Sequence, residues 1–155
     1  MKYLVVLLVT LFCSQIQGQS IDTLRGKADT KDLIKTGDWF QNAYNEYTVS
    51  PNISLSKADF KGVKVIVIMG TWCSDSRREV PHFVKMLDEY GVPARKMDIQ
   101  CVDKSKKTGL EKYDQYKIEY VPTFIFVKNG KEIGRIVEIP NKRLEEDTKG
   151  ILEVR

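Results

Sequence analysis

Apolar and polar positions along the chain fall into blocks that predict a strand, a helix and a second strand. Residues 63–69 form an almost unbroken apolar run, which is typical of a central strand buried on both faces. Apolar residues then recur at helical spacing over 76–90, and Gly91 suits the end of that helix. A further stretch over 94–99 predicts the second strand. Because a helix connects the two strands, we expect them to lie parallel.

The second half of the chain predicts a helix, a hairpin and a last helix. The helices are expected over 108–116 and 141–152. Between them, an apolar strand over 123–127 is followed by Asn129-Gly130, a strong signal for a two-residue hairpin, and by a return strand over 132–137. The order β-α-β-α-β-β-α predicts an α/β fold with a central mixed sheet and helices on both faces.

The start of the chain predicts a leader. Residues 1–18 carry a lysine, a short apolar core and a cleavage-like end, which is typical of a secretory signal peptide. The apolar core is too short for a membrane span, which takes about 20 residues. An uncleaved anchor and a lipid anchor on Cys13 are the alternatives. We therefore expect an exported protein, periplasmic or secreted.

Between the leader and the main domain lies a segment that predicts an additional helical layer. Residues 19–54 are expected to form an N-terminal helical extension, and 55–155 the main domain. The polar stretch 19–30 is predicted to be irregular. Residues 31–47 are predicted to be helical in part, with Asp38 as a cap and several aromatic residues on one face. We expect that face to pack against the main domain.

Composition allows a self-sufficient core and excludes some classes of partner. The 155-residue chain is 42% hydrophobic, which suffices for one domain without a metal or disulfide. Its formal net charge is +4, and no basic run is interleaved with aromatic residues, so nothing indicates nucleic-acid binding. One histidine, His82, and three cysteines are too few and too badly spaced for a metal site. We expect no cofactor, and we expect His82 to lie on the surface.

The candidate chemistry lies at Cys73, where the first strand gives way to the first helix. A helix start offers free N–H groups and a positive dipole end, so a thiol there ionises more readily, and the thiolate is the reactive form. The charge of Asp75 would oppose ionisation, whereas Arg77 and Arg78 would favour it, and the sequence does not rank these effects. A buried inert thiol, or half of a structural disulfide, is the alternative. Cys101 is expected to be a semi-buried free thiol, with a role as a resolving cysteine as the less favoured alternative.

At these residues the sequence resembles the thioredoxin superfamily, over roughly residues 55–155. The resemblance is carried by Trp72-Cys73-x-x-Ser76, Pro81, Val121-Pro122-Thr123 before a strand, and Asn129-Gly130. More narrowly, Cys73-x-x-Ser76-Arg77-x-Glu79-x-Pro81 is similar to the exported branch that includes the cytochrome-maturation thioredoxins. The resemblance implies a thioredoxin fold in which the bond before Pro122 is cis.

The resemblance also implies roles for the residues around the thiol. Ser76 stands where the family has its second cysteine; a hydroxyl cannot release a mixed disulfide, but it can donate a hydrogen bond to the thiolate. Glu79 would accept a proton near the site. Helix capping by Ser76 and a solvated surface position for Glu79 are the alternatives. Trp72 would stand beside the thiol, and Val121 and Pro122 would offer backbone groups to an extended substrate, unless they form an ordinary loop.

The sequence supports a leading hypothesis on function and two others. In the first, Cys73 carries out thiol–disulfide exchange as a single thiol, with client proteins and an external thiol reductant as partners. In the second, the protein is a non-catalytic module that binds peptides in the groove beside Pro122. The third, a thiol peroxidase, is disfavoured because Thr71 stands two residues before the cysteine rather than three and the proline of that motif is missing.

Overall fold

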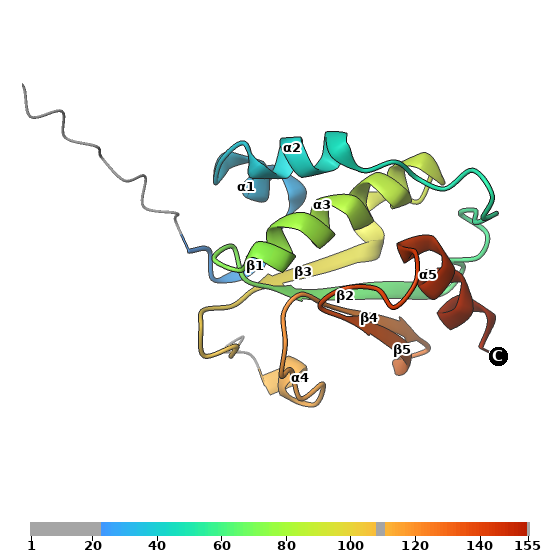
Figure 1. Ribbon diagram of the computed structural model, residues 1–155. Coiled ribbons are helices and arrows are strands. Elements are labelled where there is room, and N and C mark those ends of the chain that lie inside the picture. The colour runs from blue at the N-terminus through green and yellow to red at the C-terminus, as the bar shows by residue number, and fades with distance from the viewer. Residues whose placement is uncertain (1–22, 108–110, 155) are drawn as a thin grey trace, which may run out of the picture.

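The computed structural model describes residues 23–107 and 111–154, and within them the chain forms a mixed sheet of five strands. The predicted signal peptide, Cys13 and the start of the third predicted helix lie outside the described residues. The strands follow the spatial order β1-β3-β2-β4-β5 (Figure 1). Their bounds are β1 Gly26–Ala28, β2 Val63–Met69, β3 Met97–Cys101, β4 Thr123–Lys128 and β5 Lys131–Val137.

The central strand β2 and the parallel strand β3 confirm the β-α-β unit. β2 is buried at every position except its second, as its apolar run predicts. β3 pairs with it in parallel, in a register that puts Met69 opposite Cys101. β4 pairs with β2 in antiparallel orientation on its other side. β2 therefore lies in the middle of the sheet, and its C-terminal end carries the candidate thiol.

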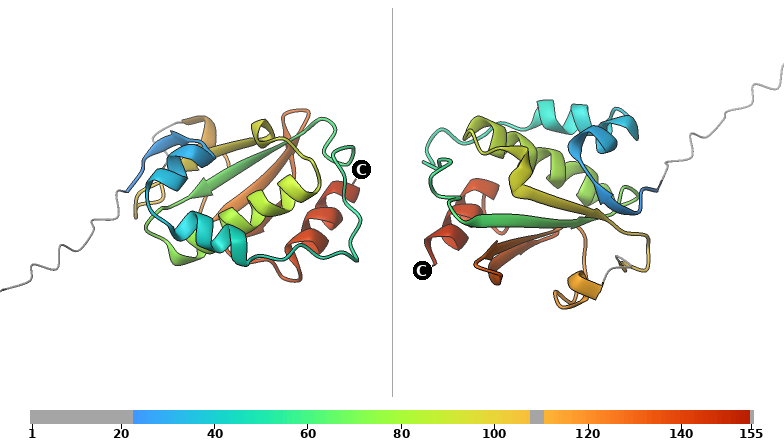
Figure 2. Two further views of the ribbon diagram at one scale, coloured as in Figure 1. Left: turned by 90° about the horizontal axis from the view of Figure 1, so that it is seen from above. Right: turned by 180° about the vertical axis from the view of Figure 1, so that it is seen from behind.

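Helices cover the sheet in two layers of unequal size (Figures 1 and 2). On one face lie the larger group: α1 Thr30–Lys35, α2 Trp39–Glu46, α3 Ser74–Glu89 and α5 Leu144–Glu153. On the other lies the short helix α4, Glu111–Asp114. The main core contains Leu33, Phe40, Phe83 and Leu144 from the larger group. A smaller cluster on the α4 side contains Ile66, Ile68, Val102, Tyr113, Val121 and Ile125. The predicted α/β class and mixed sheet are confirmed.

The hairpin between β4 and β5 forms as predicted. Asn129 and Gly130 both have positive φ angles, 52° and 76°, as the tight turn of a two-residue hairpin requires. On β5, Gly134 lies under α5, where an added Cβ would come within 2.8 Å of the Ile151 side chain. This close approach lets α5 pack on the last strand of the sheet.

Two predictions about secondary structure are wrong at the level of single elements. Residues 19–30 are not irregular throughout, because Gly26–Ala28 forms β1, an antiparallel partner of β3. Three residues are too few to show an alternating pattern, and β1 is held by backbone pairing. The second strand was expected over 94–99, but Ala94–Lys96 form a 3₁₀ turn and β3 begins at Met97. Cys101 consequently lies in the strand and not after it.

The helical part of the N-terminal segment packs on the main domain, as expected. The predicted helical stretch is two helices, separated where Gly37 has a φ of 140°. Asp38 precedes α2 but makes no side-chain capping hydrogen bond. Phe40 and Ala43 are buried and Tyr44 and Tyr47 pack against the core, which is the predicted apolar face. The domain boundary at residue 55 stays a prediction.

Candidate functional site

Cys73 occupies the turn between β2 and α3. It is the N-cap residue of α3 in extended conformation, and its carbonyl accepts a hydrogen bond from the Arg77 N–H at 3.0 Å. Its own N–H donates to the Gly70 carbonyl at 2.9 Å, which closes the turn after the strand. The side chain is half-buried. The thiol therefore sits beside the unpaired N–H groups of a helix start, as the sequence predicts.

The Val121–Pro122 turn lies directly against this thiol. The Cys73 Sγ donates a hydrogen bond to the Val121 carbonyl oxygen at 3.2 Å, across 48 residues of sequence. The Val121–Pro122 peptide bond is cis, and both side chains are buried. The Pro122 carbonyl accepts a hydrogen bond from the Glu138 N–H at 2.7 Å. Two loops far apart in the sequence are thus joined at the sulfur atom.

Trp72, the residue before the thiol in the sequence, is fixed by contacts with the backbone. Its indole lies over Gly70, where an added Cβ would be only 2.6 Å from the ring. Its Nε1 donates to the Val102 carbonyl at 2.8 Å. The exposed edge of the ring borders a hollow of about 370 Å³ whose other lining residues are Thr23, Arg25, Asp103, Lys104 and Ser105. Trp72 is consequently held in place by the backbone on both sides.

Ser76 does not cap the helix. It is the third residue of α3 and fully buried, and its hydroxyl accepts a hydrogen bond from the Gly70 N–H at 3.3 Å. The cap position belongs to Cys73, and Ser76 is a first-turn residue, the other half of the alternative reading. Within the described residues, no hydrogen bond joins the Ser76 hydroxyl to the Cys73 sulfur. The hydroxyl instead fixes the turn that carries the thiol.

Glu79 is buried in a small charged cluster on α3. Arg78 donates from Nε to its Oε1 at 2.7 Å, and the Nδ1 of His82 lies 3.7 Å from its Oε2. Burial alone would raise the pKa of Glu79, but the hydrogen bonds and charges of His82 and Arg78 outweigh it and hold that pKa below its ordinary value. His82 was expected on the surface, but its side chain is only 15% exposed and its ring stacks on Tyr47 at 4.5 Å. This helical position faces the aromatic side of α2, which periodicity on α3 alone does not reveal.

Cys101 packs in a different part of the core from Cys73. It is free, 1% exposed and part of the main core, whereas Cys73 packs against the smaller cluster. Burial, with a smaller contribution from the charge of Asp32, raises the pKa of the Cys101 thiol to about 11. The expectation of a free thiol is confirmed, although this thiol is fully buried and not semi-buried. Neither its placement nor its ionisation favours a role in resolving a mixed disulfide.

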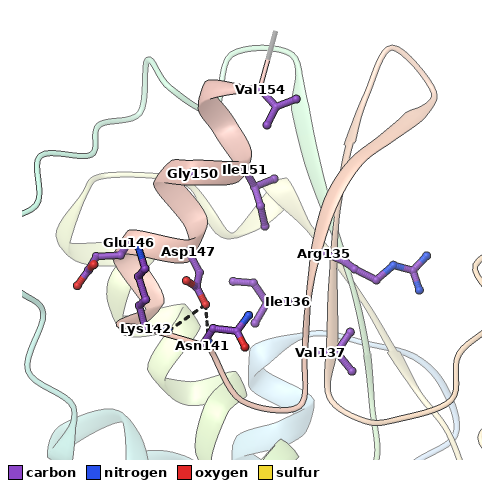
Figure 3. Close-up of a pocket in the computed structure, with 10 residues that line it drawn as sticks. All are labelled: Arg135, Ile136, Val137, Asn141, Lys142, Glu146, Asp147, Gly150, Ile151 and Val154. Atoms are coloured by element: carbon purple, nitrogen blue, oxygen red, sulfur yellow. Dashed lines mark hydrogen bonds between the residues drawn. The ribbon is translucent and has the colours of Figure 1, made fainter.

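A further hollow lies away from the thiol, between β5 and α5 (Figure 3). Its volume is about 450 Å³, and Ile136 and Ile151 face each other across it. At its end, the Asp147 carboxylate accepts hydrogen bonds from the N–H groups of Asn141 and Lys142. The candidate site residues do not line this hollow; they are Trp72, Cys73, Ser76, Glu79, Val121 and Pro122.

Metal clusters and membrane-spanning helices are both absent from the part of the chain that the structure describes. No group of three or more His, Cys, Asp or Glu side chains there is arranged to hold a metal ion. No helix there has the length and apolar character needed to cross a membrane.

The geometry agrees with what comparison with known proteins finds. A sequence profile of the family described as "Thioredoxin" matches residues 29–148, more than half of the chain. The chain belongs to the thioredoxin family. A thioredoxin from Geodia cydonium is 33% identical over 100 residues, covering 59% of this chain and 88% of that protein. Thioredoxin H9 from Arabidopsis thaliana is 25% identical over 100 residues, covering 64% and 67%.

Solved structures show the likeness of fold independently. The crystal structure of an HIV epitope-scaffold superposes with a TM-score of 0.51 at 12% identity, covering 81% of this chain and 82% of that one. Membership of the thioredoxin family supports thiol–disulfide redox chemistry as the general function. The residues that match the family profile begin at residue 29, upstream of residue 55, and so include the segment that contains α1 and α2.

Sequence reasoning missed some of the residues that shape the site. Gly70 leaves room for the Trp72 ring, and the Val102 carbonyl anchors it. Trp39, at the start of α2, lies under the guanidinium of Arg77, 5.3 Å from its carbon to the ring centroid. A glycine two residues before a Trp-Cys pair is the sequence signal for the first of these contacts. The pairing of α2 with α3 leaves no mark in the sequence.

Proposed function

We propose that the protein carries out thiol–disulfide exchange with Cys73 as its single reactive thiol. The observation that carries the proposal is the 3.2 Å hydrogen bond from the Cys73 Sγ to the Val121 carbonyl oxygen, at the start of the 16-residue helix α3. It places a half-buried thiol, the free N–H groups of a helix start and a buried turn at one point. A disulfide in an extended chain laid along that turn would meet the sulfur directly.

The proposed exchange conserves atoms and electrons. The Cys73 thiolate attacks one sulfur of a client disulfide, a bond forms between the two sulfurs, and the other client sulfur leaves as a thiolate. A second thiolate then attacks the mixed disulfide and releases Cys73. Ser76 has no sulfur for this step, and Cys101 is buried in the main core. The resolving thiol therefore comes from outside the chain, which suits isomerisation or reduction assisted by a small thiol.

The neighbouring residues have supporting roles in this proposal. Trp72, Val121 and Pro122 form the surface that receives the substrate. Ser76 fixes the turn that carries the thiol and donates a hydrogen bond to the thiolate once it forms. Glu79 has the role of proton acceptor in this proposal: its lowered pKa keeps the carboxylate ionised, but it also makes Glu79 a weaker base than an ordinary glutamate.

We further propose that the protein acts after export, like the cytochrome-maturation branch it resembles. The support for this is the leader-like sequence of residues 1–18 and the run from Cys73 to Pro81. Its partners would be client proteins with thiols or disulfides and a thiol reductant outside the cytoplasm.

Trapping of a mixed disulfide tests the proposed exchange. The protein is incubated with a small disulfide, quenched with acid and analysed by mass spectrometry. We expect an adduct on wild type and on Cys101→Ala, and none on Cys73→Ser. A Cys73 that alkylates no faster than free cysteine and yields no adduct would contradict the proposal and favour a non-catalytic peptide-binding module.

A further inference from the structure

The two arginines that follow the thiol differ in what they contact. Arg78 is occupied by carboxylates: its Nη2 lies 2.9 Å from Asp75 Oδ1 and its Nε 2.7 Å from Glu79 Oε1. These contacts raise the pKa of Arg78, with the Glu79 hydrogen bond as the largest cause. Asp75, whose charge would disfavour an anion near the thiol, is thus paired with Arg78, which it shares with Glu79. Sequence alone could not rank these charges, but the structure pairs them.

Arg77 has no such partner. No carboxylate lies within ion-pair distance of its guanidinium in the described part of the chain. Arg77 is one helical turn beyond Cys73, and its N–H donates to the Cys73 carbonyl. Residues four apart share a helix face, and long side chains on a helix lean toward its N-terminus. Arg77 is therefore a positive charge without an ion-pair partner among the described residues, one helical turn beyond the thiol.

Trp39 holds this charge in place. The carbon of the Arg77 guanidinium lies 5.3 Å from the Trp39 ring centroid, within the range of a cation–π contact. Trp39 is itself fixed: its Nε1 donates to Thr36 Oγ1 at 2.9 Å, and its ring meets Phe40 edge-on at 5.7 Å. Helices α2 and α3 begin at the same end of the molecule (Figure 1). The N-terminal segment thus supplies a residue that positions Arg77.

From these contacts we propose that Arg77, positioned by Trp39, is a specificity-determining residue that binds an anionic group beside the reacting sulfur of the substrate. The inference rests on the proposed exchange at Cys73 and names its substrate class: disulfides and thiols flanked by a carboxylate. A contact with the face of an aromatic ring leaves the guanidinium N–H groups available, and these match a carboxylate in pairs.

Two aliphatic disulfides of similar length and opposite charge test the inference. Dithiodipropionate carries carboxylates and cystamine carries ammonium groups, and the rate of adduct formation on Cys73 is measured with each by mass spectrometry. For wild type, added salt should slow the anionic probe and speed the cationic one. Arg77→Gln should lower the anionic-to-cationic rate ratio roughly two- to fivefold, the range expected for one exposed ion pair. Arg77→Lys should restore part of the ratio, and Trp39→Ala should lower it.

The chain offers a matched control on the same pair of helices. Lys85 of α3 lies 4.9 Å from the Tyr44 ring centroid of α2 and pairs with Glu89 at 3.1 Å. It is twelve residues beyond the thiol, about 18 Å along the helix. Lys85→Gln removes the same charge and should leave the ratio unchanged.

The outcomes distinguish a failure of this inference about Arg77 from a failure of the proposed thiol–disulfide exchange at Cys73. An unchanged ratio in Arg77→Gln, or an equal slowing of both probes, would overturn the inference and leave the exchange intact. An equal change in Lys85→Gln would also overturn it, because net charge would then explain the result. A wild-type Cys73 that reacts with neither probe would refute the proposed exchange itself.

Discussion

The sulfur of Cys73 and the carbonyl oxygen of Val121 are 3.2 Å apart and joined by a hydrogen bond. This contact closes the gap between the end of β2 and the loop before β4, two segments that share no local sequence signal. It also means that the thiol already has a partner that an incoming substrate must displace or share. In the proposed exchange, the reactivity of Cys73 would therefore depend on a backbone group as well as on the helix start.

Ser76→Cys should give the protein a dithiol site. The new thiol would stand at the position of the family's second cysteine, so we expect it to form a disulfide with Cys73 and to support catalytic reduction of a disulfide substrate with dithiothreitol as reductant. The variant should lose about 1 kcal/mol of stability, because the buried Gly70 N–H loses its oxygen acceptor. A variant that folds with native circular dichroism but shows no gain in turnover would disprove the account of the missing thiol.

Gly70→Ala should displace Trp72. An added Cβ would lie 2.6 Å from the indole, so the ring must leave its place and give up the hydrogen bond to Val102. We expect a loss of about 1–3 kcal/mol in the free energy of unfolding, a shift in tryptophan fluorescence and slower adduct formation on Cys73. Gly150→Ala is a suitable comparison, since nothing lies within 4 Å of an added Cβ there and its φ is not positive. If fluorescence and rate stay at wild-type values, the ring is not fixed by Gly70.

Glu79→Gln should make stability less dependent on pH. The folded-state pKa of Glu79 is lowered, so its contribution is present above the unfolded pKa and is lost as pH falls through the folded one. We expect a destabilisation of about 1–3 kcal/mol at pH 7, shrinking toward zero in acid. Urea unfolding of both proteins from pH 7 to pH 3 measures it. If the difference in free energy of unfolding between wild type and Glu79→Gln grows as the pH falls, the pKa of Glu79 is not lowered in the folded protein.

The same variant tests the proposed proton acceptor. If Glu79 receives the proton of Cys73, adduct formation should slow in Glu79→Gln at neutral pH and recover as the pH rises. Equal rates across the range would leave Glu79 with a structural role alone.

Cys101 should stay unreactive while the protein is folded. Its raised pKa of about 11 keeps the thiol protonated at neutral pH, and its side chain is 1% exposed. We expect iodoacetamide to label Cys73 in the native protein and Cys101 only after unfolding, as peptide mass spectrometry would show. Labelling of both at similar rates in the folded protein would reopen a resolving role for Cys101.

The sequence predicted those parts of the fold that local patterns determine. The apolar run of β2, the helical spacing of α3 and the Asn129-Gly130 turn each specify their own element, and each forms as predicted. Cys73 could be placed at the strand-to-helix turn for the same reason. The short strand β1 was not predicted, because its three residues are held by pairing with β3 and carry no pattern of their own.

Other features of the site depend on contacts between distant segments. The buried state of His82 depends on Tyr47, and the free charge of Arg77 depends on which carboxylates its neighbour Arg78 binds. A helical pattern gives the face on which such residues lie, but not what covers that face. The roles of the charged residues around Cys73 could therefore be named from the sequence but not ranked.

The short strand β1 limits how far the protein can be truncated from its N-terminus. A fragment starting at residue 55 would look complete by its hydrophobic pattern, yet it would strip the outer edge of β3 and leave a row of open amide and carbonyl groups. An exposed edge strand can pair with a strand of another molecule, which promotes aggregation. Such a fragment would also lose the indole that steadies Arg77. Useful shortened versions should keep the chain from residue 23 onward.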